Sequence, residues 1–383
     1  MSHSEEPRAA ADAPPASAPP SDPRALGRYL ATFGITLVCL CLAAGITNHR
    51  LDPLNFSTAH HVHLAETFNK GENFAIYDPS FEFRGLRREH IRRMPDTPDV
   101  LIFAGSRFQE ATAETLPFTG VTFYNAFVHS DYYEDYLALS ELLIQANRLP
   151  KTLVLSVRYK SFMPVAERTT DEWRMFAPEY RAMADRLGVE KLGWLESAPI
   201  PFWLNVVSLP VVRRNVELSW KHRSARTGPT TEASQEVFDT LRPDGALVFS
   251  KQHQATWTLE SSRADAIKRA KKASKEKLSV DRGRVLGFTK LLDELKRRGT
   301  HVVIAMTPHH PHYWRGIAES PYGRTLAGIE REMYEIGAAH GATVVGSFDA
   351  DRAGCIEATF LDYIHFTNEC LKAVFSGIPA VTR

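Results

Sequence analysis

Short apolar runs alternate with helix-forming segments along most of this chain, from residue 99 onward. The apolar runs are rich in Val, Ile and Leu and lie at 100–103, 121–124, 151–157, 301–306 and 342–346. Segments with the composition and end signals of helices lie at 131–147, 285–298 and 325–340. Each helix can carry the chain back to the start of the next strand, so such strands pair in parallel. This order predicts an α/β fold: a doubly wound parallel sheet with helices on both faces.

Two long segments precede or interrupt this alternation. Residues 49–98 come before the first strand and are expected to form a connecting and packing region. The aromatic-rich segment of about 171–240 is expected to be a helical insertion that serves as a lid or a partner surface. Pro243, Asp244 and Gly245 predict a turn directly after it. We therefore expect residues 99–383 to form one large domain that contains the insertion.

The N-terminal 48 residues divide into a polar tail and an uncharged apolar segment. Residues 1–28 are rich in Pro, Ala and Ser without apolar periodicity, which predicts a disordered cytoplasmic tail. Residues 29–48 carry no charge, and about twenty apolar residues span a bilayer as a helix. Arg24 and Arg28 favour a cytoplasmic N-terminus, so the segment predicts a single-pass anchor in the cytoplasmic membrane, with the following domain in the periplasm or outside the cell. A cleaved signal peptide and a buried helix are the alternatives.

The first apolar run ends on Ala104, Gly105 and Ser106. A serine at this place lies at the carboxyl edge of a parallel sheet, where such folds bind ligands. Gly105 permits a tight turn, and segment 108–114 is expected to open a helix. Ser106 is therefore either a nucleophile or only the N-cap of that helix.

Asp362 and His365 lie three residues apart near the C-terminus, just before a short helical segment. A serine hydroxyl becomes a good nucleophile only when a base accepts its proton. A histidine that acts as this base needs an acid to fix its tautomer and to stabilise its cation. Ser106, His365 and Asp362 therefore predict a catalytic triad.

An early strand-end serine combined with a late Asp-x-x-His resembles the SGNH (GDSL-like) hydrolase superfamily, whose fold is a flavodoxin-like three-layer α/β/α sandwich. The motifs match at Ser106, Asp362 and His365, whereas Ala104 replaces the first glycine of the serine motif. The resemblance implies that the Ser106 amide, a glycine and an asparagine stabilise the oxyanion; Asn125 is the candidate asparagine, and no residue is assigned as the glycine. It implies no cofactor.

In its single apolar segment and the order of its motifs, the chain resembles membrane-anchored SGNH-like proteins that work with membrane-bound O-acyltransferases. Such proteins act in teichoic acid D-alanylation and in polysaccharide O-acetylation. This resemblance implies a serine acyltransferase or esterase that acts on O-acyl groups, expected to be acetyl, of a cell-surface polysaccharide through an acyl-serine. The implied partners are that polysaccharide and a membrane-bound O-acyltransferase. The alternative is a catalytically silent scaffold that binds the glycan or the acyltransferase.

Three further residues are expected to contact substrate. Arg107 follows the nucleophile and is expected at the cleft rim, where it would pair with an anionic glycan or acyl donor. A surface ion pair is the alternative for Arg107. His309 and His312 follow the apolar run 301–306 and are expected to line the cleft from the same edge of the sheet.

The remaining expectations concern ions and thiols. His60, His61 and His63 have no Cys, Asp or second histidine cluster nearby, so no metal site is expected. The formal net charge of +1 argues against nucleic-acid binding. Cys355 and Cys370 bracket the Asp-x-x-His motif, and an oxidising compartment would allow a disulfide between them. Two buried thiols are the alternative.

Overall fold

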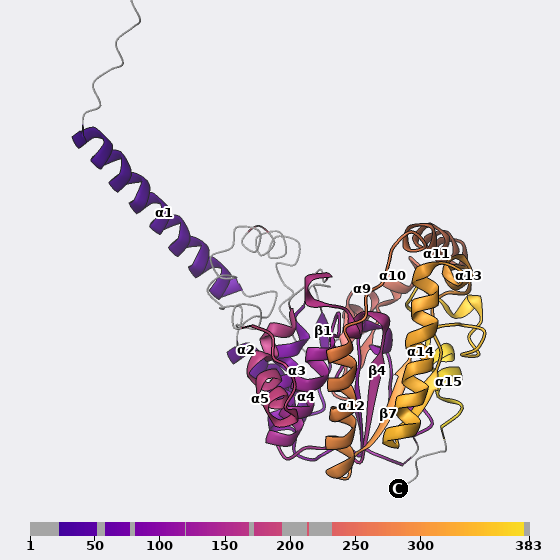
Figure 1. The fold of residues 1–383 in the computed structure, drawn as a ribbon. Coiled ribbons are helices and arrows are strands. Elements are labelled where there is room, and N and C mark those ends of the chain that lie inside the picture. The colour runs from indigo at the N-terminus through magenta and orange to yellow at the C-terminus, as the bar shows by residue number, and fades with distance from the viewer. Residues whose placement is uncertain are drawn as a thin grey trace, which may run out of the picture.

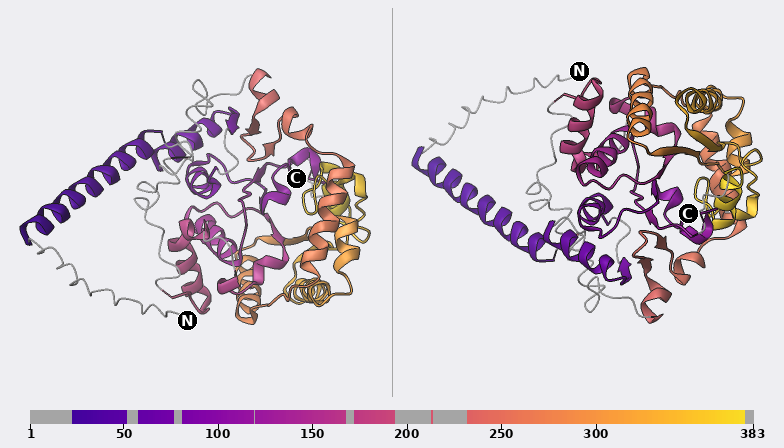
Figure 2. Two further views of the ribbon diagram at one scale, coloured as in Figure 1. Left: turned by 90° about the horizontal axis from the view of Figure 1, so that it is seen from above. Right: turned by 90° about the horizontal axis from the view of Figure 1, so that it is seen from below.

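The computed structural model describes most of the chain, namely residues 23–51, 58–76, 81–118, 120–167, 172–193, 213 and 232–378. Helix α1 (Pro23–Leu51) begins the described part and projects away from the rest of the molecule in both views of Figure 2. Its segment Arg24–Ile46 is long and apolar enough to cross a membrane, and only 6% of the most apolar window is buried. The predicted apolar helix is therefore present. Residues 23–28 of the predicted tail are helical, and the remainder of that tail lies outside the described residues.

A five-stranded sheet forms the centre of the fold, with strand order β3-β2-β4-β7-β8. Every neighbouring pair in this sheet is parallel. The strands are β2 (Val100–Phe103), β3 (Phe123–Asn125), β4 (Thr152–Val157), β7 (His301–Met306) and β8 (Thr343–Gly346). The prediction of an α/β fold built on a parallel sheet is confirmed.

The strand order determines where the sheet can bind a ligand. From β2 the chain passes to its edge neighbour β3 and then returns to β4, on the other side of β2. The connections that leave β2 and β4 therefore run in opposite directions across the sheet. Open α/β sheets bind ligands at such a switch point, outside the carboxyl ends of the strands. Ser106 lies three residues beyond the end of β2, at this point.

Two hydrophobic clusters cover the two faces of the sheet. Leu101 and Phe103 of β2 belong to one cluster, and Val100 and Ile102 belong to the other, because successive strand side chains point to opposite faces. The first cluster includes side chains of α4 (Tyr133–Gln145), α12 (Arg282–Arg297) and α14 (Pro321–His340), and α15 (Asn368–Phe375) contributes to the second. Figure 1 shows α12 and α14 running alongside β4 and β7.

A second, antiparallel sheet of three short strands lies beside the main sheet. Its order is β1-β5-β6, with β1 (Phe74–Ile76), β5 (Asp239–Leu241) and β6 (Leu247–Val248). The predicted turn at Pro243–Gly245 joins β5 to β6. Gly245 adopts φ +83°, and a side chain there would lie 2.1 Å from the carbonyl oxygen of Asn125. The Asn125 amide in turn donates to the carbonyl of Asp244 (2.7 Å), so the hairpin packs against the end of β3.

The remaining helices surround these sheets. They are α2 (Thr58–Asn69), α3 (Phe83–Arg93), α5 (Ala177–Leu187), α9 (Glu232–Val237), α10 (Lys251–Gln254), α11 (Leu259–Ala273) and α13 (Pro311–Ile317). Residues 49–98 thus supply α2, β1 and α3, and their apolar side chains belong to the same cluster as those of the main sheet. The predicted insertion contains α5, while residues 194–212 and 214–231 of it lie outside the described part.

Candidate active site

Ser106 opens a short 3-10 turn, Ser106–Phe108, at the carboxyl end of β2. The buried carboxylate of Asp131 lies directly against Gly105, so a Cβ at position 105 would be 2.3 Å from Asp131 Oδ1. Glycine before the serine is therefore required by this close approach rather than by a positive φ, since Gly105 has φ −80°. The consequence is a fixed backbone that presents the Ser106 side chain at the sheet edge.

Ser106, His365 and Asp362 form one hydrogen-bonded chain. Ser106 Oγ lies 3.0 Å from His365 Nε2, and His365 Nδ1 lies 2.7 Å from Asp362 Oδ2. The structure brings these three residues together across 259 positions of sequence, in the geometry expected of a nucleophile, a base and an orienting acid.

Asp362 is held in its charged form. Burial acts to raise the pKa of this carboxyl, but the hydrogen bond and charge of His365 lower it, and the backbone amides of His365 and Ile364 lower it further. Both amides donate to Oδ1 at 2.7 Å, which leaves Oδ2 for the imidazole. The turn therefore fixes the carboxylate and the ring relative to each other.

A cavity of about 290 Å³ opens onto the triad. Ser106, Asp362 and His365 line it together with residues from α3, from the β3–α4 connection, from the small sheet and from α10 and its flanks. A cavity of this size fits a small-molecule or side-group substrate. No protein family model matches this chain, and no curated protein matches its sequence. Function is therefore inferred from the site itself.

His129 lines the same cavity and is uncharged near neutral pH. Burial lowers the pKa of its imidazole to about 4, and electrostatic interaction with Arg84, His365 and Arg87 acts in the same direction. Its ring stacks on Phe83, with ring centroids 5.0 Å apart. The following residue, Ser130, has φ +53°, a conformation that non-glycine residues seldom adopt and that is found at functional sites.

Asn125 does not face the cavity, and the prediction that it stabilises the oxyanion is wrong. Its fully buried side-chain amide donates to the carbonyls of Phe108 (2.7 Å) and Ala111 (3.0 Å), and Gln109 O lies at 3.4 Å. Its Oδ1 accepts from the amide of Phe127 (3.1 Å). These bonds explain why no long helix follows Ser106: carbonyls that would bond within a helix bond to Asn125 instead, and only two 3-10 turns form.

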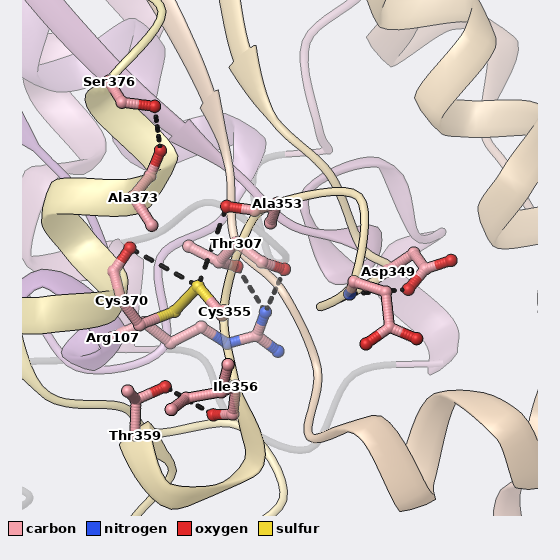
Figure 3. The surroundings of a disulfide bond; sticks show 11 residues. Arg107, Thr307, Asp349, Ala353, Cys355, Ile356, Thr359, Cys370, Ala373 and Ser376 are labelled. Atoms are coloured by element: carbon pink, nitrogen blue, oxygen red, sulfur yellow. Dashed lines mark hydrogen bonds between the residues drawn. A yellow bond between two sulfur atoms is a disulfide. The ribbon is translucent and has the colours of Figure 1, made fainter.

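Arg107 is not among the residues that line the cavity, so the prediction that it reaches the rim is also wrong. Its side chain is buried, and Nη1 donates to the carbonyl of Thr307 (3.3 Å) and to the Thr307 hydroxyl. Figure 3 shows this guanidinium turned toward Thr307 beside the disulfide. Burial lowers its pKa, as does the charge of Arg158. Arg107 therefore connects the Ser106–Phe108 turn to the residue that follows β7.

His309 and His312 are not among the residues that line the cavity, which contradicts the predicted substrate contacts. His309 is fully buried, its Nδ1 lies 3.3 Å from the carbonyl of Phe348, and burial keeps its pKa well below the ordinary value. Pro311 starts α13 and carries His312 outward, where Nε2 lies 3.5 Å from Glu357 Oε1. Across the described ranges, no cluster of three or more His, Cys, Asp or Glu could hold a metal ion.

Cys355 and Cys370 are joined by a disulfide, with 4.9 Å between their Cα atoms. Of the two alternatives that the sequence left open, the structure therefore contains the bridge. It links the segment before Asp362 to helix α15, which follows His365 (Figure 3). The turn that carries Asp362 and His365 therefore lies within one covalently closed loop.

Several cavity residues were not predicted from the sequence, among them His129, Asp239, Phe249, His253 and Trp257. One signal was available: Phe249, His253 and Trp257 are spaced four residues apart, which places side chains on one face of a helical segment. No pattern in the sequence showed that this face turns toward Ser106, since β5 and β6 are only three and two residues long.

Proposed function

We propose that this chain is a membrane-anchored serine acyltransferase or esterase that acts on O-acyl groups of a cell-surface polysaccharide, with an SGNH-like doubly wound domain. The observation that carries the proposal is the Ser106–His365–Asp362 hydrogen-bond chain at the edge of a cavity. Acetyl is the acyl group that we propose, by resemblance to polysaccharide O-acetylation proteins.

The proposed reaction proceeds by double displacement. His365 accepts the proton of Ser106 Oγ as that oxygen attacks the acyl carbonyl, and it then donates the proton to the leaving oxygen. Asp362 orients the imidazole and stabilises its cation. A sugar hydroxyl or water next attacks the acyl-serine, gives its proton to His365, and Ser106 Oγ regains a proton as it leaves. The Ser106 amide, which donates to no other described group, supplies an oxyanion donor.

The proposed location is the cytoplasmic membrane, with the domain in the periplasm or outside the cell. Helix α1 can span a bilayer by length and composition, and a disulfide is typical of an oxidising compartment. A membrane-bound O-acyltransferase is the proposed partner, as the source of acyl groups on the outer side.

A catalytically silent scaffold is the second candidate. The observation that favours it is the side-chain amide of Asn125, which is occupied by backbone carbonyls rather than aimed at an oxyanion. A scaffold would keep the fold and the cavity but would have no activated serine.

Covalent labelling by a fluorophosphonate distinguishes the two candidates, because only an activated serine reacts. We expect the full chain in detergent to be labelled. Ser106→Ala and His365→Ala should reduce labelling by roughly ten-thousandfold or more, as loss of a triad member does. Ser376→Ala, at the exposed C-terminal end of α15, is the matched control and should label normally. Absence of labelling in the unaltered chain would favour the scaffold.

A further inference from the structure

A second Asp–His pair faces the same cavity as the triad. His253 Nδ1 on α10 lies 3.1 Å from Asp239 Oδ2 on β5, and both residues line the cavity with Ser106 and His365. Asp239 Oδ1 also accepts the amide of Ser250 (2.8 Å), so the carboxylate is fixed by the hairpin. In the neutral tautomer whose Nδ1 proton is donated to this carboxylate, Nε2 is left as a hydrogen-bond acceptor. Within the described chain, no group donates to that Nε2.

Aromatic rings surround His253. The ring centroids of Phe249 and His253 are 4.6 Å apart, those of Phe249 and Trp257 are 4.7 Å apart, and those of His253 and Trp257 are 4.8 Å apart. All three side chains line the triad cavity. They therefore form one aromatic wall with a hydrogen-bond acceptor in it, in the cavity that Ser106 also lines.

We propose that Phe249, His253 and Trp257, with Asp239 behind them, form the binding site for a neutral sugar ring that presents a hydroxyl to Ser106. Aromatic faces pack against the apolar C–H face of a pyranose, and His253 Nε2 accepts a hydrogen bond from a ring hydroxyl beside the reacting one. No Lys or Arg occurs among the described residues that line this cavity, so it favours an uncharged ring over an anionic one. His253 is a binding residue here, and His365 remains the base.

The neighbouring space is large enough for further sugar units. Phe249 also lines a second cavity of about 710 Å³, together with Asn73, Arg242 and Gln254. Arg242 is ion-paired with Asp244 (2.8 Å), so its charge is compensated. A polymer could therefore place one ring at Ser106 and its neighbours beyond Phe249.

The role of the ring as acyl acceptor rests on the proposed function. In that step the acceptor oxygen forms a bond to the acyl carbon, the bond from that carbon to Ser106 Oγ breaks, and the acceptor proton passes through His365 to Ser106. Binding of the ring does not need this chemistry, which allows the two ideas to be tested separately.

The test measures binding of methyl β-D-glucopyranoside to the full chain carrying Ser106→Ala, in a detergent without a sugar headgroup, by saturation-transfer NMR. Adding His253→Gln or Trp257→Leu should raise the Kd at least fivefold, and Trp257→Phe should restore most of the affinity. His340→Gln is the matched control, because His340 forms the same kind of pair with Asp293 (2.6 Å) outside the cavity. Glycerol, which offers hydroxyls without a ring face, should not respond to Trp257→Leu.

The inference is overturned if the Ser106→Ala parent does not bind the pyranoside, or if His253→Gln and Trp257→Leu bind it as tightly as the parent. Either result leaves the proposed function intact when the unaltered chain reacts with fluorophosphonate. Failure of that reaction together with loss of pyranoside affinity in the variants would instead support the sugar site and reject the acyl-serine chemistry.

Discussion

Glycine at position 105 is the residue on which the placement of the nucleophile depends most directly. A methyl group there would lie 2.3 Å from Oδ1 of Asp131, whose carboxylate is buried and pairs with Arg158 (2.8 Å). Because Asp131 is held in this buried ion pair with Arg158, we expect the turn Ser106–Phe108 to shift instead. The separation of Ser106 from His365 should lengthen as a result.

We therefore expect Gly105→Ala to destabilise the domain by about 1–3 kcal/mol, the usual cost of overpacking a buried site. It should also slow fluorophosphonate labelling. Thermal unfolding and labelling rate measure the two effects. Gly328→Ala is the control, because a Cβ there meets no atom within 4 Å and alanine in a helix gains roughly 0.5–1 kcal/mol over glycine. A Gly105→Ala protein with unchanged stability and labelling would show that Asp131 does not constrain the turn.

The triad could be predicted from the sequence, whereas the residues around it could not. Ser106, Asp362 and His365 are recognisable because each lies in a short motif with its own chemistry. Asn125 and Arg107 were misplaced because sequence proximity to a strand end does not determine which way a side chain points. The hydrogen bonds from Asn125 to the carbonyls of Phe108 and Ala111 depend on the tertiary packing of the segment after Ser106 against β3.

Among the strands, too, some could be predicted from the sequence and others could not. Strand β7 has the bounds that its apolar run predicts, and β4 differs by one residue, because buried parallel strands are continuous apolar runs. Strands β1, β5 and β6 are too short for any periodicity, and β1 pairs with β5 across more than 160 positions of sequence. The cavity wall that they carry was therefore not predictable from local pattern.

The disulfide is the element-scale feature with the clearest effect on stability. By the chain-entropy estimate, closing a loop of about fifteen residues contributes roughly 3 kcal/mol. We expect Cys355→Ser with Cys370→Ser to lower the unfolding temperature of the domain and to slow labelling of Ser106, because the loop contains Asp362 and His365. Differential scanning calorimetry and labelling rate provide the readouts.

Cys39→Ser with Cys41→Ser is the matched control for the disulfide. Both cysteines are free and exposed on α1, remote from the triad turn. Their replacement should leave the domain's unfolding temperature unchanged. Equal unfolding temperatures for the two double variants would contradict a stabilising role for the bridge.

At the scale of the whole molecule, stability should fall in mild acid. Folding lowers the pKa of His129 from its ordinary value of 6.5 to about 4, so the unfolded chain binds more protons between these two values. The free energy of unfolding therefore decreases as the pH falls from 6.5 toward 4. At about 1.4 kcal/mol per pH unit for one proton, the total loss is up to about 3 kcal/mol.

His129→Gln removes this titration and should flatten the acid side of the curve of unfolding temperature against pH. Burial also lowers the pKa of His90, to about 3, so part of the slope should remain. The measurement is thermal unfolding at intervals between pH 7 and pH 4. An identical acid slope in His129→Gln and in the unaltered chain would exclude His129 as its source.

Membrane attachment is the second whole-molecule prediction. Because α1 is apolar and largely unburied, we expect alkaline carbonate extraction to leave the full-length chain with the membrane. Leu37→Arg, near the middle of α1, should weaken this retention, since a central arginine costs about 2.5–3.5 kcal/mol on insertion scales. Leu26→Arg, near the end of the helix, is the control and should be retained. Release of a shortened soluble form from the unaltered chain would indicate a cleaved signal peptide instead.

Ser106 and the Asp362–His365 pair lie far apart in the sequence and are therefore synthesised at different times. Ser106 emerges early in synthesis, and His365 follows 259 residues later, after the last strand of the sheet. A growing, partly translocated or C-terminally cut chain therefore carries a serine without its base. Under the proposed mechanism such a chain is inert toward esters, and reactivity begins only when the turn that carries Asp362 and His365 has formed beside Ser106.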